Sequence, residues 1–141
     1  MNIVVIGIGQ TLRGDDGAGL EAVRRWQEKY PATAARVRVE LSELPGLGLI
    51  DLLSGADAAV IVDAVQSESA APGTVLRLGP EEAAAFTPGS GSAHGWGAAE
   101  TLTLGRTLDP SLAGCRITLI GCCNFPTRKS RHAPLRSFVP R

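Results

Sequence analysis

The segment that most limits the fold is the beginning of the chain, because residues 2–8 are almost continuously apolar. A strand without alternation of polar and apolar side chains is typical of a sheet whose two faces are both covered. The segment ends in the turn Gly7-Ile-Gly9, and a helical pattern follows as far as Tyr30, where Pro31 predicts an end. A buried strand followed by a helix is the first unit of a parallel α/β architecture.

Strands and helices continue to alternate along the rest of the chain. Residues 57–63 form a second apolar run, which is typical of a central strand. A strand at 74–78 follows with no room for a helical crossover, so we expect it to be antiparallel or peripheral. The sequence therefore predicts a single three-layer α/β/α domain whose twisted five-stranded sheet is mostly parallel, with one antiparallel strand. The other expected elements are strands at residues 36–41 and 116–121 and helices at residues 44–54, 81–85 and 94–108.

The composition argues against several classes of partner. The chain has 141 residues and a formal net charge of zero, so it carries no excess of basic charge for binding nucleic acid. No apolar stretch is long enough to span a bilayer, and the first residues lack the basic region of a secretory signal. The odd number of cysteines favours reduced thiols. We therefore expect a cytoplasmic protein without membrane insertion, with structural or incidental cysteines at Cys115, Cys122 and Cys123.

Charge is distributed unevenly along the chain. All fourteen acidic residues lie at or before Asp109, together with eight basic residues, and the other six basic residues lie after it. The segment after the last expected strand contains three prolines, five basic residues and no acidic residue, and it shows no helical periodicity. We expect residues 1–123 to form the domain and residues 124–141 to be a basic, poorly packed tail.

Three separated polar residues, Asp16, Asp63 and His94, fall where the expected strands end or a helix begins. Asp16 follows the first strand, Asp63 ends a central strand, and His94 lies in a glycine-rich loop before a helix. In open α/β sheets, ligands bind outside the carboxyl ends of the strands, so these side chains are expected at one rim. Two carboxylates and an imidazole can bind a transition-metal ion and leave coordination positions open.

Each of these residues also has a structural explanation. Asp15 or Asp16 is well placed to cap the following helix, because carboxylates satisfy its free amide groups. Asp63 can accept a hydrogen bond from a neighbouring loop amide, and a single loop histidine is often a surface residue or a cap. The turn Gly7-x-Gly9 leaves a nucleotide-binding function open, because it matches the first two glycines of a dinucleotide fingerprint, although Leu12 replaces the third.

Three motifs together resemble those of the nickel-iron hydrogenase maturation endopeptidases. The first is Gly7-Ile-Gly9-Gln-Thr-Leu-Arg-Gly-Asp15-Asp16-Gly-Ala-Gly19, in which Gln10 replaces the usual Asn. The second is Val60-Ile-Val-Asp63-Ala64, and the third is Ser92-Ala-His94-Gly-Trp-Gly97. The order and the spacing of the motifs both fit that family, and the resemblance covers most of the chain.

The resemblance implies a metal-dependent endopeptidase that removes a C-terminal extension from the large-subunit precursor of a nickel-iron hydrogenase. The nickel would be contributed by that nickel-loaded precursor. The segment after Gly121 departs from the C-terminal helix usual in the family, so an inactive homologue remains an alternative, as does a nucleotide-binding module. The implied metal ligands and catalytic residues are Asp16, Asp63 and His94, and the turn that presents Asp16 is shaped by Gly7, Gly9 and Gly17.

We predict that residues 124–141 do not form a stable helix packed on the sheet. Three prolines each remove a backbone donor, and the five basic residues repel one another. Burying the large apolar side chains of the segment offers on the order of 6–10 kcal/mol, whereas ordering its backbone costs roughly 1–2 kcal/mol per residue. In hydrogen exchange on the whole chain, these amides should exchange much faster than those of residues 58–63, and equally slow exchange would contradict the prediction.

Overall fold

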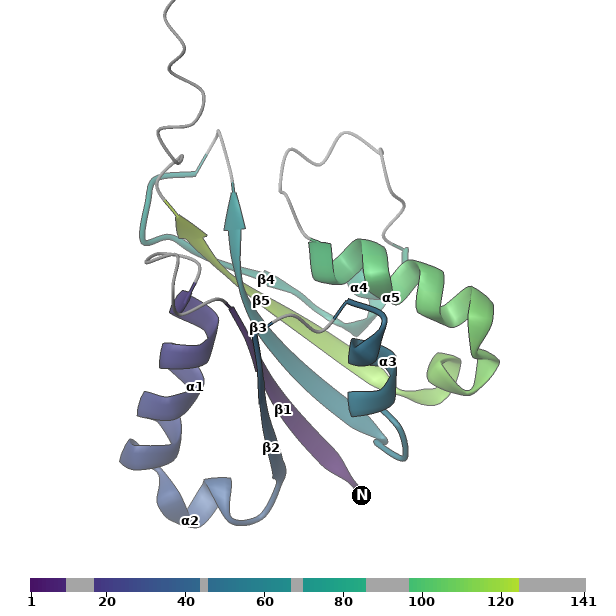
Figure 1. The fold of residues 1–141 in the computed structure, drawn as a ribbon, viewed down its shortest axis with the longest axis horizontal. Helices are drawn as coiled ribbons and strands as arrows, with labels where there is room; N and C mark the ends of the chain where they lie inside the picture. Colours follow the sequence, from purple (N-terminus) through teal and green to yellow (C-terminus); the bar gives the residue numbers. More distant parts are fainter. Residues whose placement is uncertain (10–16, 44–45, 67–69, 86–96, 125–141) are drawn as a thin grey trace, which may run out of the picture.

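The computed structural model of the chain describes residues 1–9, 17–43, 46–66, 70–85 and 97–124, and shows a five-stranded sheet between helices (Figure 1). The strands are β1 (Ile3–Ile8), β2 (Arg38–Ser42), β3 (Ala58–Gln66), β4 (Val75–Leu78) and β5 (Arg116–Asn124). Their order in the sheet is β2-β1-β3-β5-β4. All neighbouring pairs are parallel except β4 and β5, which are antiparallel. The predicted sheet is therefore confirmed, including its single antiparallel strand.

Helices cover both faces of the sheet, as the three-layer prediction requires. α1 (Ala18–Lys29) and the short α2 (Pro31–Ala34) lie on one face (Figure 1). α3 (Gly48–Leu52), α4 (Pro80–Ala85) and α5 (Gly97–Leu108) lie on the other, and a 3-10 helix, η2 (Pro110–Gly114), leads from α5 to β5. Within the described ranges, no helix is long and apolar enough to cross a bilayer.

The main core lies between the sheet and the layer of α3, α4 and α5. Ile6 of β1, Ile61 of β3 and Leu119 of β5 are completely buried there, together with Leu102 of α5. Burial of each such side chain contributes roughly 1.5–3 kcal/mol relative to leaving it exposed. On the opposite face, α1 is anchored by its own buried stripe, which includes Leu20.

The first turn of α1 approaches the sheet so closely that only glycine fits at the contact. A Cβ atom on Gly19 would lie 2.3 Å from the carbonyl oxygen of Ile8 and 2.5 Å from that of Val62. A Cβ atom on Gly7 would lie 3.0 Å from the carbonyl oxygen of Gly19. The two glycines, one in the strand and one in the helix, therefore let α1 rest directly on the backbone at the carboxyl end of β1 and the middle of β3.

β3 and β5 extend further than the sequence pattern predicts. β3 continues past residue 63 to Gln66, and β5 continues past residue 121 to Asn124. The two extensions pair with each other, with Ala64 opposite Cys122 and Val65 opposite Cys123. This mutual pairing makes strands of segments that have no strong periodicity of their own, and it carries the last strand one residue beyond the expected domain boundary at 123. Residues 125–141, the rest of the expected tail, lie outside the described residues.

Two helices begin later than the sequence pattern predicts. The N-cap of α1 is Gly17, so the expectation that Asp15 or Asp16 caps this helix is wrong in position, and both residues lie outside the described ranges. α3 begins at Gly48 rather than at residue 44, whereas α5 is described from Gly97 and its expected start at residue 94 lies outside the described residues. The end of α1 before Pro31 is as predicted, and the same proline then occupies the first turn of α2.

The break expected at Asp109-Pro110 contains the helix η2, which the sequence pattern did not predict. Asp109 is its N-cap, and the Oδ1 atom accepts hydrogen bonds from the backbone N of Ser111 at 3.0 Å and from its Oγ at 2.6 Å. These hydrogen bonds hold the pKa of the Asp109 carboxyl below its ordinary value, and the bond from the Ser111 side chain has the largest effect. The cap thus fixes the turn between α5 and β5.

We predict that Gly19→Ala lowers the free energy of unfolding by about 1–3 kcal/mol, the range of overpacking substitutions. The new methyl group cannot displace the backbone carbonyls of Ile8 and Val62 without moving α1. Gly48→Ala is the matched control, because a Cβ atom there meets nothing within 4 Å and alanine favours the helix. Urea unfolding of the two variants measures the difference, and equal stability of both would contradict the close contact.

Candidate functional site

The carboxyl ends of β1 and β3 form the point where chain connections diverge. From β1 the chain passes through α1 to β2 on one side, whereas from β3 it passes to β4 on the other side of the sheet. Connections that leave adjacent parallel strands in opposite directions open a crevice between them, which is where open α/β sheets bind ligands. This point is therefore the candidate functional site.

Asp63 lies beside the carboxyl end of β1, inside β3 rather than at the end of that strand. β1 pairs with β3 only as far as Val62, which is opposite Gly7, while β3 continues beside β5. Asp63 is therefore the first residue of β3 beyond the β1 pairing, and its partner on β5 is Gly121, which carries no side chain. The expected strand end is corrected to a position in mid-strand where one neighbouring strand has already turned away.

The Asp63 carboxylate is half-buried and held by a local hydrogen bond. Its Oδ1 atom accepts the backbone N–H of Ala64, the next residue of the same strand, at 2.8 Å. By the alternation of the strand, Asp63 is on the same face as the buried residues Ile61 and Val65. The Asp63 side chain therefore faces the side of the sheet covered by α3, α4 and α5.

Asp16 and His94, the other two predicted ligands, lie outside the described residues, so their meeting with Asp63 stays a prediction. The chain on either side of them is described. Gly17 directly follows Asp16, and two residues later a Cβ atom on Gly19 would lie 3.0 Å from the Cα of Asp63. α5 begins three residues after His94, on the face toward which Asp63 is directed. Among the described residues, no three His, Cys, Asp or Glu side chains gather as a metal site.

The predicted turn-shaping glycines have different structural roles. Gly7 packs against α1, as described above, and the backbone N of Gly9 donates to the carbonyl oxygen of Ser42 at 3.2 Å, which joins the ends of β1 and β2. Gly17 has an ordinary φ of −81° as the N-cap of α1. The sequence interpretation did not identify Gly19 as a structural residue, although it is the last glycine of the first motif. The close packing of α1 on β1 and β3 requires glycine at this position.

The cysteines show no features of an activated nucleophile. All three are free, Cys115 and Cys123 are buried, and Cys122 is half-buried. Burial raises the pKa of the Cys115 thiol. Burial also raises the pKa of Cys122, with smaller effects from Cys123 and from the Asp63 carboxylate. A raised pKa keeps these thiols protonated at neutral pH, which is unsuited to nucleophilic catalysis.

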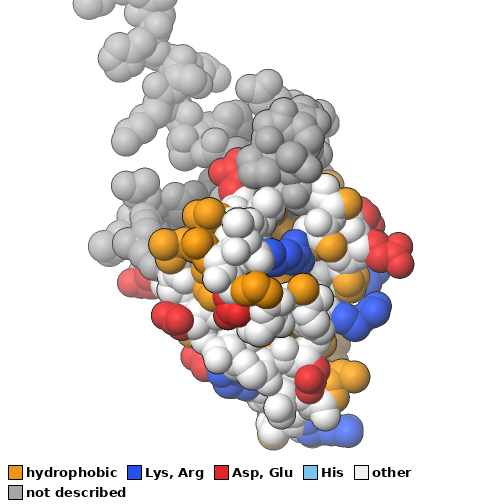
Figure 2. All heavy atoms as spheres, turned by 90° about the vertical axis from the view of Figure 1, so that its right-hand side faces the viewer, with side chains coloured by type: hydrophobic (Ala, Val, Ile, Leu, Met, Phe, Trp, Pro, Cys, Tyr) orange, Lys and Arg blue, Asp and Glu red, His pale blue; other side chains and the backbone are white. Residues whose placement is uncertain are grey.

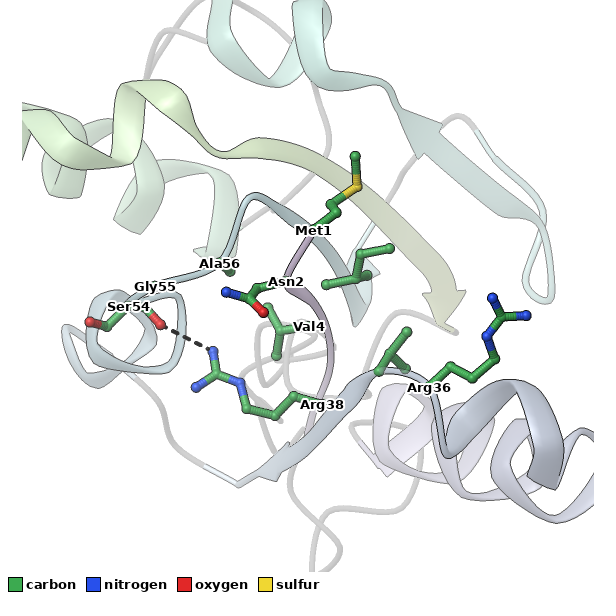
Figure 3. A pocket seen from close by; sticks show the side chains of 10 residues that line it. Met1, Asn2, Val4, Arg36, Arg38, Ser54, Gly55 and Ala56 are labelled. Carbon is green, nitrogen blue, oxygen red and sulfur yellow. Dashed lines mark hydrogen bonds between the residues drawn. The ribbon is translucent and has the colours of Figure 1, made fainter.

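A separate cavity of about 340 Å³ opens at the amino edge of the sheet, away from Asp63 (Figure 3). Arg38 lines it, and its guanidinium donates to the carbonyl oxygens of Leu52 at 2.5 Å and Ser54 at 3.4 Å. These bonds satisfy carbonyls at the end of α3 and connect that helix to β2. The arginine thus has a structural explanation, and the cavity is not part of the candidate site.

Sequence comparisons identify the family of the chain. A family model described as hydrogenase maturation protease matches residues 44–138, a range that includes Asp63 and His94. The chain is 31% identical over 121 residues to the hydrogenase expression/formation protein HupD of Rhodobacter capsulatus, covering 85% of this chain and 56% of that protein. It is 30% identical over 103 residues to the hydrogenase 2 maturation protease of Escherichia coli K12, covering 73% of this chain and 62% of that protein. The chain belongs to the hydrogenase maturation protease family, and it spans less than two thirds of the length of these two relatives.

Solved structures agree with this assignment. The [NiFe] hydrogenase maturation protease HybD of Thermococcus kodakarensis aligns over 87% of this chain and 80% of its own, with a TM-score of 0.62 and 28% identity. An endopeptidase of Escherichia coli studied in solution aligns over 87% of this chain and 74% of its own, with a TM-score of 0.65 and 26% identity. The predicted resemblance and the fold are therefore both confirmed.

Proposed function

We propose that this chain is an endopeptidase that removes a C-terminal extension from the large-subunit precursor of a nickel-iron hydrogenase. The observation that carries the proposal is Asp63, a half-buried carboxylate at the crevice between β1 and β3 in a chain of the maturation protease family. Several relatives are named as hydrogenase maturation proteases, and the match to two of them covers most of this chain.

Asp16, Asp63 and His94 form the proposed metal site. Two carboxylates and one imidazole are a donor set that suits nickel and zinc and leaves coordination positions for a substrate. We propose that the nickel arrives as part of the precursor, so that these three residues recognise a loaded substrate. A bound metal would supply Lewis-acid polarisation of a carbonyl or of water. The hydrogen bond from the backbone N of Ala64 to Oδ1 of Asp63 restrains this carboxylate, which supports its proposed role as a ligand.

The alternative of a nucleotide-binding module has less support. Its sequence signal was the turn Gly7-x-Gly9, but packing against Gly19, Leu41 and Val23 already explains why residue 7 is glycine. A glycine required for packing gives no reason to expect a phosphate beside it. The protease proposal instead uses a half-buried carboxylate in a chain of the maturation protease family.

We predict that Asp16→Ala, Asp63→Asn and His94→Ala each weaken the binding of nickel or zinc by at least about tenfold. Substitution of residues that only hydrogen-bond to a metal ligand already lowers metal affinity by about that factor. The Asp63→Asn variant should keep its fold, because the two side chains have nearly the same shape. Asp51→Asn is the control, because it removes an exposed carboxylate on α3. Isothermal calorimetry measures the affinities, and unchanged binding in all three site variants would refute the site.

We predict that cleavage depends on nickel in the precursor. Nickel-loaded and nickel-free large-subunit precursors are incubated separately with the protein, and intact mass reports loss of the extension. The loaded precursor should be cut and the nickel-free one should remain intact. His94→Ala should remove this preference, because imidazole is the donor best suited to nickel in the set. Equal cleavage of both precursors by the unaltered chain would contradict nickel recognition, and no cleavage of either would contradict the enzyme.

A further inference from the structure

β4 is an edge strand of the described sheet, and some of its backbone groups bond to no other described strand. The backbone N of Cys123 donates to the carbonyl oxygen of Thr74, which precedes β4. The backbone N of Arg116 donates to the carbonyl oxygen of Asp57, which precedes β3. Alternate residues of β5 therefore bond to β4 and to β3. By the register of the antiparallel pair, the N–H and C=O groups of Val75 and Arg77 point away from β5, toward the open edge.

The side chains of this edge are exposed and unlike each other. Val75 is 65% exposed, and Arg77 is also exposed on the same face of the strand. Leu76 and Leu78 point to the opposite face and pack against the core, so they fix the strand in place. Unpaired backbone N–H and C=O groups make an edge strand a template for pairing, and the exposed Val75 adds an apolar contact beside them.

Charge distinguishes β4 from β2, the other edge strand of the sheet. Within the described part of the chain, ion pairs join Arg25 to Glu21 and Arg38 to Glu40, and none includes Arg77. On β2, the Nε atom of Arg38 lies 4.0 Å from Oε1 of Glu40, and the guanidinium also donates to the carbonyl oxygen of Leu52 at the end of α3. The charge of Arg38 is therefore already compensated. Arg77 is thus an edge cation suited to an acidic side chain on an added strand.

The edge also leads to the candidate site. Because β4 is antiparallel to β5, it begins at the carboxyl edge of the sheet. There Val75 lies opposite Cys122 of β5. The residue before Cys122 is Gly121, whose partner on β3 is Asp63. A strand added to β4 would lie three strand spacings from β3, about 14 Å. Four or five extended residues span that distance.

We propose that the free edge of β4 binds an extended segment of the polypeptide substrate as an added antiparallel strand, an inference that rests on the proposed protease function. An endopeptidase must hold its substrate as an extended chain, and strand addition supplies main-chain hydrogen bonds for this purpose. Antiparallel pairing places an acidic residue opposite Arg77 and, two residues later, an apolar residue opposite Val75. The chain then continues toward Asp63.

The direct test uses two synthetic peptides with blocked ends, Thr-Thr-Glu-Thr-Val-Thr-Thr and its counterpart with Lys in place of Glu. Each is titrated into the isotopically labelled full chain, and backbone amide shifts are recorded by NMR. The Glu peptide should shift the amides of residues 74–78 at lower concentration than the Lys peptide. Arg77→Glu should invert this order. An absence of shifts in β4, or an unchanged order in the variant, would overturn the proposal.

A second pair of variants tests the backbone contribution. Val75→Pro removes the backbone N–H that points to the open edge, and it leaves the hydrogen bonds between β4 and β5 in place. Proline is tolerated at such edge positions. Binding of the Glu peptide should weaken about fivefold, the effect of one lost hydrogen bond. Val75→Thr keeps the N–H and should retain binding. Equal affinity in both variants would overturn the proposal, and where Val75→Pro fails to fold, Arg77→Glu decides.

Two further measurements separate this inference from its competitors. Concentration-dependent shifts in β4 without any peptide would show that two copies pair through this edge, which would also overturn the proposal. In the precursor assay, Val75→Pro should slow cleavage relative to Val75→Thr. Equal cleavage rates would remove the edge from substrate binding and leave the proposed function intact. Peptide binding at β4 without cleavage of any precursor would remove the protease function instead.

Discussion

The close contact of Gly19 with the carbonyl groups of β1 and β3 is the constraint on which the functional end of the molecule depends. It fixes where α1 begins, because the first turn of the helix rests on strand backbone rather than on side chains. It also brings the chain that follows Asp16 to within contact distance of Asp63, although the two residues are far apart in sequence. A larger residue at either Gly7 or Gly19 would move the helix and this end of the sheet apart.

The second determinant is the unequal length of the strands. β3 and β5 pair for nine residues, whereas β1 leaves β3 after Val62. Asp63 therefore has a paired strand on one side and no strand partner on the other, within the described residues. The rigid scaffold comes from the core packed around Ile61 and Leu119, so the residue with proposed chemistry is held by elements that have no chemical role themselves.

The sequence predicted those features that arise from local patterns. The apolar run before Gly9 identified a buried parallel strand, and the short connection before residue 74 identified the antiparallel one. The extensions to Gln66 and Asn124 were missed because they depend on pairing between distant segments. The expected strand end at Asp63 was wrong, because β3 continues to Gln66, and the place of Asp63 in a functional site stays a prediction. The role of Gly19 was also missed, because steric exclusion by Ile8 and Val62 becomes visible only when the helix and sheet are assembled. For Asp16 and His94 the sequence motifs remain the source of the assignment.

The alternation of side chains in β5 has a consequence for the two adjacent cysteines. Neighbouring residues of a strand point to opposite faces, so Cys122 and Cys123 are separated by the sheet itself. Cys123 is enclosed in the core, whereas Cys122 lies on the face that carries α1. The native fold thus prevents a vicinal disulfide between them, and any oxidative cross-link of the folded chain through this pair must form between molecules, at Cys122.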